Sequence, residues 1–257
     1  MADQFHKSYR IAPDTFRIDE NGIANAYLLL GEKKALLIDS GDGVGNIREV
    51  VEEITKLPVT VALTHLHCDH AGGVNWFDSY CYHRNDNKGI YYLEASNWAA
   101  KHLARMSGKK LVFSKKPHKA KKMLFDDNVV FDLGGRIIRI MNTPGHTLGS
   151  TVFIDEKEHL IFTGDEINYW LWLQLPGCTS VEKWLPNAKQ LLSLADHFTF
   201  YCGHNDGLLS KNMVEELVSR GEELVNGAKG VKVSRGVYAY PDNNWKEHSV
   251  IWYHKVK

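Results

Sequence analysis

The stretch THLHCDHAGG, residues 64–73, places three histidines and an aspartate within six positions at the end of an apolar run. His65 and His67 stand at positions i and i+2, so in an extended segment both side chains project to the same side and can bind one ion. Asp69 and His70 are adjacent where the chain turns into a helix, and they point elsewhere, toward a second ion. Imidazole and carboxylate ligands suit zinc, and also iron or manganese. The stretch therefore predicts a metal site.

Three further segments repeat one pattern, an apolar strand followed by a glycine and then by a histidine or an aspartate. The segment MNTPGHTLGS contains His146, LIFTGDEI contains Asp165 and FTFYCGHNDG contains His204. In sheet proteins the ends of strands are where loops gather functional residues. We therefore expect these side chains to join those of residues 65–70.

Patterns of apolar residues on both sides of these motifs predict alternating strands and helices. Apolar runs predict hairpins over 25–41 and 150–165 and single strands over 59–64, 79–83, 129–135, 136–142, 198–203, 236–240 and 248–254. Helical spacing predicts helices over 45–57, 93–108, 181–195 and 211–225, the last behind Ser210 as its N-cap. The sequence thus predicts one domain over residues 1–257, with two sheets and helices on their outer faces.

Composition narrows the class of protein. The 257 residues carry no formal net charge, so no overall field draws the chain to nucleic acid or to a membrane. No apolar run reaches the roughly 18 residues of a transmembrane helix, and the first residues lack the apolar core of a signal peptide. Four cysteines lie far apart without a CxxC pair, which does not indicate a disulfide framework. We therefore expect a cytoplasmic protein, and the 13 histidines indicate metal or proton chemistry.

The ordered set of motifs, with NAYLL…ALLIDSG near the N-terminus, resembles the metallo-β-lactamase superfamily, in particular its glyoxalase-II-like and lactonase-like branch. The resemblance covers nearly the whole chain. It implies an α+β fold, an αββα sandwich of two mixed sheets with a dinuclear site at one edge. The implied cofactors are two Zn²⁺ ions, with Fe or Mn as alternatives. Carried over residue by residue, the first metal is bound by His65, His67 and His146, the second by Asp69, His70 and His204, and Asp165 bridges both.

The resemblance implies a metal-dependent hydrolase. We hypothesise that a hydroxide shared by the two ions attacks the acyl carbon of an ester, lactone or thioester of a small molecule, and that Asp69 orients this nucleophile. Tyr169 lies close enough in sequence to Asp165 to donate a hydrogen bond to a developing oxyanion. Lactone-cleaving members of the superfamily use a tyrosine soon after that aspartate, so Tyr169 is the second expected catalytic residue.

Three alternatives stay open at this point. The same ligand set serves phosphodiesterases. Some relatives bind a single iron and oxidise a persulfide. A binding protein with slow turnover would keep the metals and recruit a partner. True β-lactam hydrolysis fits less well, because zinc β-lactamases usually carry a non-histidine residue where His70 stands in this chain.

Two segments bear on substrate and partners. The loop 167–177, INYWLWLQLPG, can wall an apolar pocket, form a partner surface such as that of a homodimer, or pack in the core. The stretch 101–122 carries nine Lys or Arg and no acid, so it forms a solvated face, attracts an anionic substrate or binds nucleic acid. Its few aromatic residues argue against nucleic acid. A small-molecule substrate is the expected partner.

Overall fold

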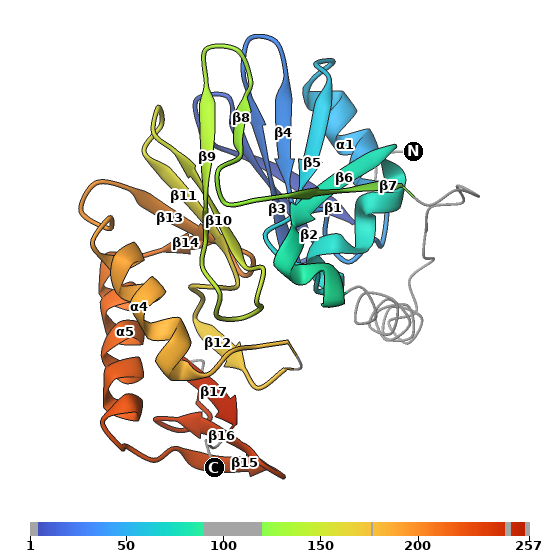
Figure 1. The fold of residues 1–257 in the computed structure, drawn as a ribbon. Coiled ribbons are helices and arrows are strands. Elements are labelled where there is room, and N and C mark those ends of the chain that lie inside the picture. Colours follow the sequence, from blue (N-terminus) through green and yellow to red (C-terminus); the bar gives the residue numbers. More distant parts are fainter. Residues whose placement is uncertain (1–4, 90–119, 176, 245–247, 255–257) are drawn as a thin grey trace.

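The computed structural model describes residues 5–89, 120–175, 177–244 and 248–254, and their strands form three sheets (Figure 1). The predicted helix over 93–108 and most of the basic stretch 101–122 lie outside the described residues. The seven-stranded first sheet consists, in spatial order, of β1 (His6–Ala12), β2 (Thr15–Glu20), β3 (Ala24–Leu30), β4 (Ala35–Ile38), β5 (Val59–Ala62), β6 (Ser79–His83) and β7 (Lys121–Phe125). The six-stranded second sheet consists of β14 (Leu208–Leu209), β13 (Thr199–Cys202), β11 (Leu160–Gly164), β10 (Thr151–Asp155), β9 (Ile137–Asn142) and β8 (Val130–Asp132).

Both sheets are mixed, as the sequence predicts. In the first sheet β1 to β4 pair antiparallel, whereas β4 to β7 pair parallel. In the second sheet the β11–β13 pair is parallel and the other pairs are antiparallel. The predicted hairpins over 25–41 and 150–165 are confirmed as β3–β4 and β10–β11.

The packing of the two sheets against each other follows from the alternation of side chains between the two faces of each strand. On β3, Tyr27 and Leu29 pack with Phe153 and Phe162 of the second sheet, in a cluster between the two sheets. The intervening Leu28 belongs to a different cluster, on the outer face of the first sheet. Successive side chains of a strand point to opposite faces, so both faces of β3 are apolar and both are covered.

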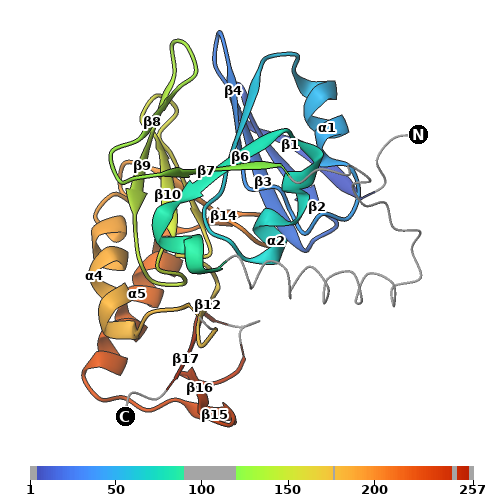
Figure 2. The ribbon, with the colours of Figure 1, turned by 45° about the vertical axis from the view of Figure 1, so that its right-hand side comes forward.

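Helices cover the two outer faces, as predicted, and Figure 2 shows them on opposite sides of the sandwich. Helix α1 (Ile47–Ile54) buries Ile47, Val50 and Val51 against the first sheet. Helices α4 (Val181–Leu192) and α5 (Lys211–Val225) pack on the second sheet through Trp184 and Leu217. The predicted N-cap of α5 is confirmed, because the Ser210 side chain accepts a hydrogen bond from the backbone N–H of Met213.

A third sheet, which the sequence analysis does not anticipate, lies at one end of the second sheet (Figure 1). It contains, in spatial order, β12 (Trp170–Leu173), β17 (Val250–His254), β16 (Val237–Tyr240) and β15 (Val231–Ser234). The expectation of a loop over 167–177 is therefore wrong for residues 170–173. These residues form a strand because β12 pairs in parallel with β17, nearly eighty positions later in the chain. No local pattern reveals such a distant pairing.

Cys68, Cys81, Cys178 and Cys202 are present as thiols. Among the described residues, no helix has both the length and the apolar character needed to cross a membrane.

Candidate metal centre

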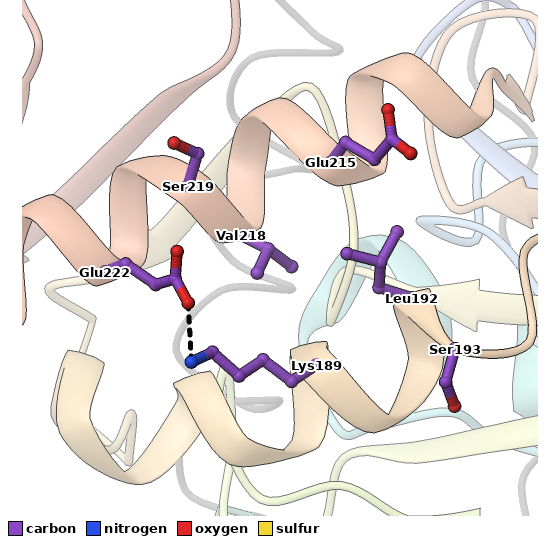
Figure 3. A pocket seen from close by; sticks show the side chains of 7 residues that line it. All are labelled: Lys189, Leu192, Ser193, Glu215, Val218, Ser219 and Glu222. Atoms are coloured by element: carbon purple, nitrogen blue, oxygen red, sulfur yellow. Dashed lines mark ion pairs between the residues drawn. The ribbon is translucent and has the colours of Figure 1, made fainter.

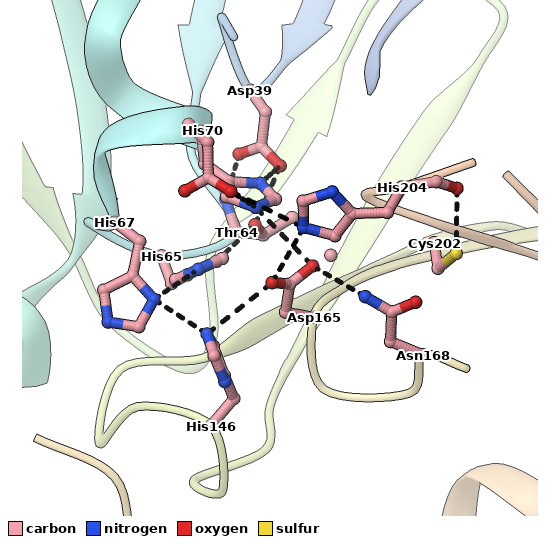
Figure 4. A network of polar contacts seen from close by, with 12 residues as sticks. Asp39, Thr64, His65, His67, His70, His146, Asp165, Asn168, Cys202 and His204 are labelled. Atoms are coloured by element: carbon pink, nitrogen blue, oxygen red, sulfur yellow. Dashed lines mark hydrogen bonds and ion pairs between the residues drawn. The ribbon is translucent and has the colours of Figure 1, made fainter. Parts of the chain in front are cut away.

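Four loops at one edge of the sandwich carry the predicted ligands (Figure 4). The first loop follows β5 and contains the short helices α2 (Cys68–Ala71) and η1 (Gly72–Trp76), and a further 3₁₀ helix, η2 (Arg84–Gly89), follows β6. The other three loops follow β9, β11 and β13. They assemble two groups able to hold metal ions, with the ligand atoms of each group within 4.8 Å of one another: the histidine group, His65, His67 and His146, and the mixed group, Asp69, His70, Asp165 and His204.

The histidine group brings three ring nitrogens together. The Nδ1 atom of His67 lies 3.1 Å from Nε2 of His65 and 2.7 Å from Nε2 of His146. The rings of His65 and His146 are each nearly perpendicular to that of His67, so their edges rather than their faces meet. This geometry directs the nitrogens of all three residues at one point.

The mixed group is organised around Asp165. One carboxylate oxygen of Asp165 lies 3.1 Å from Nε2 of His204, and the other lies 3.5 Å from Nε2 of His70. Asp69 lies 3.5 Å from Nε2 of His204. Asp165 also lies 3.7 Å from Nε2 of His146, which belongs to the histidine group. Asp165 is thus the residue through which the two groups meet.

In four of the histidines, a hydrogen bond at Nδ1 orients the ring so that Nε2 points toward the other members of its ligand group. In each ring Nδ1 faces an acceptor and therefore carries a proton. A neutral imidazole protonated at Nδ1 has a lone pair at Nε2, so these Nε2 atoms can act as metal ligands. The four pairs are His146 with the Trp172 carbonyl (2.7 Å), His204 with the Ile23 carbonyl (2.6 Å), His70 with the Asp39 carboxylate (2.9 Å) and His65 with the Thr64 hydroxyl (3.0 Å).

The two groups differ in charge. Burial lowers the pKa of His146 to about 4, and burial likewise lowers the pKa values of His65 and His67. Burial also acts to lower the pKa of His204, but the Asp165 and Asp69 carboxylates outweigh it and raise that pKa to about 9. The histidine group is therefore neutral at pH 7, whereas the mixed group is held together by ion pairs.

This donor set fits divalent cations. In the histidine group, His65 and His146 carry their protons at Nδ1, so each ring presents a lone pair at Nε2 to Nδ1 of His67. His67 can place only one proton at Nδ1, and this proton cannot pair with both lone pairs. In the mixed group, the buried Nε2 atom of His70 has no hydrogen-bond partner among the described residues. Nitrogen and carboxylate ligands in sets of three or four are those that zinc takes in proteins.

Asp39 is a functional residue that the sequence analysis missed. It follows β4, and its backbone has a positive φ of 62°. One oxygen of its carboxylate accepts a hydrogen bond from the Thr64 backbone N–H, at 2.8 Å. The other accepts from the Thr64 hydroxyl and from Nδ1 of His70. Asp39 thereby orients His70 directly and His65 through Thr64. The motif ALLIDSG contained it, but only the folded chain shows what it contacts.

We predict that Asp39→Asn weakens metal binding about 10- to 100-fold, as loss of a partner behind a metal-binding histidine commonly does. An amide keeps one acceptor oxygen but turns its NH₂ group toward donors, so it cannot hold both Thr64 and His70 in place. The measurement is the metal dissociation constant, obtained by competition with a chelating indicator. Asp127→Asn is the matched control, because Asp127 pairs with His83 at 2.8 Å, outside both ligand groups. Equal metal affinities in the two variants would contradict the positioning role of Asp39.

Asp86 is a second residue that the sequence analysis missed, and it joins the loops of the two sheets. Its carboxylate accepts hydrogen bonds from the backbone N–H groups of Leu66, at 3.0 Å, and of Gly149, at 2.8 Å. Leu66 lies between two members of the histidine group, and Gly149 lies three residues after the third member. Asp86 therefore fixes the distance between the halves of this group. No local signal in the sequence marks it.

Tyr169 does not stand free beside the centre. Its hydroxyl donates a hydrogen bond to the Leu208 carbonyl at 3.0 Å. Its neighbour Asn168 is fully buried and donates a hydrogen bond to the carboxylate of Asp165, at 3.3 Å. The role of Tyr169 as an oxyanion donor stays a prediction, and it requires the hydroxyl to exchange its Leu208 partner.

A groove between α4 and α5 lies away from this centre (Figure 3). An ion pair between Lys189 and Glu222, at 2.6 Å, crosses it. The residues that line the groove are Lys189, Leu192, Ser193, Glu215, Val218, Ser219 and Glu222. None of them belongs to either ligand group.

The αββα sandwich, with histidines and aspartates gathered where its strands end, defines a class of metal-binding proteins. The sequence model of the Metallo-beta-lactamase superfamily matches residues 19–204, and the chain belongs to this superfamily. The resemblance and the fold class inferred from the sequence are thereby confirmed. Strands β15, β16 and β17 lie beyond the matched residues.

Several curated relatives of the chain are named as thioesterases. The acyl-coenzyme A thioesterase MBLAC2 of Gallus gallus is 25% identical over 199 residues, which cover 67% of this chain and 68% of that protein. The MBLAC2 of Homo sapiens is 23% identical over 198 residues, with the same coverage. The atrochrysone carboxyl ACP thioesterase of Aspergillus chevalieri is 29% identical over 147 residues, which cover 56% of this chain and only 40% of that protein. These relatives confirm the expectation of a hydrolase.

Solved structures agree on the fold. The superfamily protein ST1585 from Sulfolobus tokodaii has a TM-score of 0.57 at 21% identity, covering 84% of this chain and 85% of its own. The DIM-1 metallo-beta-lactamase exposed to ceftazidime has a TM-score of 0.61 at 16% identity, covering 87% of this chain and all of its own. Identities this low show a shared fold and leave the substrate open.

Proposed function

We propose that the protein is a dinuclear zinc thioesterase that hydrolyses acyl thioesters of coenzyme A or of an acyl carrier protein. The observation that carries the proposal is the meeting of the histidine group and the mixed group at Asp165. The relatives named acyl-CoA and ACP thioesterases support the substrate class. The same chemistry would serve an ester or a lactone, so the substrate panel below includes both.

The two groups would each hold one ion, and Asp165 would contact both. When bound, a pair of divalent ions supplies a hydroxide at neutral pH and a Lewis acid for the carbonyl oxygen. The chain's own contribution is to fix its ligands in advance, through the hydrogen bonds behind His70, His146 and His204. Ligands that are already oriented lose little freedom when the ions bind.

Asp69 is the carboxylate best placed to handle a proton. Its side chain is 27% exposed, the most open of the mixed group. Burial acts to raise its pKa, but His70 and His204 outweigh burial and hold the pKa below its ordinary value. An ionised Asp69 can accept a hydrogen bond from the attacking water and then pass that proton to the departing sulfur. A thiol has a pKa of about 8.5, so a thiolate needs little help to leave.

The test combines metal analysis with a substrate panel. The protein is purified without added metal, its metal content is measured, and turnover is followed on an acyl-CoA, an acyl-ACP, an aryl ester, a lactone and a phosphodiester. We expect zinc at two ions per chain and the highest kcat/KM on the thioesters. A single iron with persulfide-dependent oxygen uptake would overturn the proposal, and so would a preference for the phosphodiester.

Removal of metal is predicted to lower thermal stability. Without cations, the carboxylates and imidazoles of the two ligand groups remain packed together, and the side chains of His65, His70 and His146 are almost fully buried. A ligand present at 100 to 1,000 times its dissociation constant stabilises a fold by about 3–4 kcal/mol, which for a chain of this size shifts Tm by on the order of 5–15 °C. Differential scanning calorimetry before and after chelation measures the shift. Re-addition of zinc should restore Tm, and an unchanged Tm would argue against tightly bound metal.

The proposal includes the compartment. The four cysteines are free, and two of them, Cys68 and Cys178, are only partly buried. Thiols persist in a reducing compartment, so we place the protein in the cytoplasm. Cell fractionation with an antibody against the protein tests this placement.

A further inference from the structure

His204 is a ligand of the second sheet that is supported from the first sheet. It lies in the loop after β13, and its Nε2 atom lies 3.1 Å from the Asp165 carboxylate (Figure 4). Its Nδ1 atom donates to the Ile23 carbonyl, which belongs to the turn between β2 and β3 of the first sheet. The orientation of this ligand therefore depends on how its loop is held against β2 and β3.

Asn25 of β3 holds the chain on both sides of His204. Its backbone N–H donates a hydrogen bond to the Gly203 carbonyl, at 2.8 Å. Its side-chain amide donates to the Asn205 carbonyl, at 3.2 Å. Asn25 is almost fully buried. One residue of the first sheet thus fixes the peptide groups before and after the ligand.

Arg17 of β2 binds the same carbonyl. Its Nη1 atom donates to the Asn205 carbonyl, at 3.1 Å, and to Oδ1 of Asn25, at 2.9 Å. The guanidinium lies over the ring of Tyr9, 4.6 Å from the centroid, which adds a cation–π contact. Asn205 has a positive φ of 56°, a region that few non-glycine residues adopt, so its conformation depends on contacts such as these.

Tyr27 contacts the start of the same loop. It stands two positions after Asn25 on β3 and opposite Arg17 in the β2–β3 register, so the three side chains share the face that packs on the second sheet. Its hydroxyl donates to the Cys202 carbonyl, at the end of β13. A Cβ atom at Gly207 would collide with that hydroxyl, so glycine lets the loop close around it. We call Arg17, Asn25 and Tyr27 the inner-face clamp.

The mixed group draws its ligands from both sheets. Asp69 and His70 follow β5 of the first sheet, whereas Asp165 and His204 follow strands of the second. A shift of one loop relative to the other sheet would separate these pairs. The inner-face clamp ties the His204 loop to the first sheet, so it helps to keep Nε2 of His204 within 3.5 Å of the Asp69 carboxylate.

We propose that the inner-face clamp is a set of positioning residues that fixes His204 and thereby sets the affinity of the mixed group for its metal ion. This inference rests on the proposed function, in which each ligand group holds one ion. The hydrogen bonds from the clamp to the loop end on carbonyls of residues 202, 203 and 205, on either side of the ligand. A ligand that is held in place before the ion arrives loses less freedom on binding it.

The experiment measures two metal dissociation constants. Metal-free protein is titrated with zinc in competition with a chelating indicator, and His204→Ala identifies the constant that belongs to the mixed group. Asn25→Ala removes the side-chain amide but keeps the backbone N–H, and Arg17→Met removes the guanidinium. We expect each of these two variants to raise the mixed-group constant about tenfold, as loss of support behind a metal ligand does, and to leave the histidine-group constant unchanged.

Two further variants separate positioning from a general loosening of the fold. Arg17→Lys retains a cationic donor for the Asn205 carbonyl, so it should recover most of the affinity that Arg17→Met loses. Arg220→Met is the matched control, because Arg220 is also partly buried but pairs with Glu216 on α5, which carries no member of either ligand group. It should leave both metal constants unchanged, even where it lowers Tm.

A double variant tests whether the two side chains act through one carbonyl. Because Arg17 and Asn25 both donate to the Asn205 carbonyl, combining Arg17→Met with Asn25→Ala should raise the mixed-group constant by less than the product of the two single effects. Effects that multiply fully would show that the two residues act separately, and would overturn the clamp as a unit.

The outcomes distinguish this inference from the function on which it rests. Wild-type protein that takes up only one ion would overturn the two-ion centre, and the clamp assignment with it. Wild-type protein that binds two ions, with the mixed-group constant unchanged in Asn25→Ala and Arg17→Met, would overturn the clamp assignment alone. The same conclusion follows if both constants rise by equal factors, because that pattern indicates a loosened fold rather than a displaced His204.

Discussion

Asp165→Asn is expected to reduce kcat about a thousandfold or more, since a metal pair contributes several kcal/mol of transition-state stabilisation and each 1.36 kcal/mol is tenfold in rate. The substitution keeps the size of the side chain and removes its charge. The Asp165 carboxylate lies within 3.7 Å of nitrogens from both ligand groups, so an amide in its place weakens both at once. Metal content is the second readout, and we expect it to fall below the wild-type stoichiometry.

The control for this variant is Asp196→Asn. Asp196 is exposed and pairs with Lys211 at the surface, and such pairs contribute little to stability. The same chemical change should therefore leave turnover and metal content as they are in the wild type. An Asp165 variant that retains full metal content and wild-type turnover would contradict the assignment of Asp165 as the shared ligand.

The parts of the fold that the sequence predicted are those whose signals are local. The β3–β4 hairpin has a short charged turn between apolar runs, and α5 has Ser210 at its start. The strand-end residues His146, Asp165 and His204 also follow local patterns of apolar run, glycine and ligand. Their close approach in the structure follows from the rule that loops gather at the ends of strands.

The parts that escaped prediction depend on which segments meet in space. The β12–β17 pairing joins residues 170–173 to residues 250–253, so part of the segment that was expected to be a loop is a strand. Asp39 acquires its role only because Thr64 and His70 are brought against it. Asp86 links two loops that belong to different sheets. Such contacts arise from tertiary structure, and secondary-structure propensity and hydrophobic periodicity do not predict them.

The two halves of the centre belong to different sheets, so the contact between those sheets bears on function. Arg136 lies just before β9 of the second sheet and is almost fully buried. Its guanidinium pairs with the fully buried Asp155 of β10. It also donates to the carbonyls of Asp14, at 2.8 Å, and Leu30, at 3.0 Å, which belong to the first-sheet side of the sandwich. One side chain thus fastens the second sheet to the first.

Arg136→Met is expected to destabilise the protein by about 3–5 kcal/mol, because it leaves the Asp155 carboxylate buried without its cation. For a chain of this length that corresponds to a fall in Tm of roughly 6–20 °C in a thermal unfolding experiment. Arg139→Met, three residues later in β9, is the control: Arg139 pairs with Glu156 at the surface, and both side chains are more than half exposed. Because the Asp155 charge is the cause, adding Asp155→Leu to Arg136→Met should recover part of the loss. If the Arg136→Met and Arg139→Met variants have the same Tm, the buried ion pair does not hold the two sheets in contact. The alignment of the two ligand groups must then depend on other contacts, such as those of Asp86.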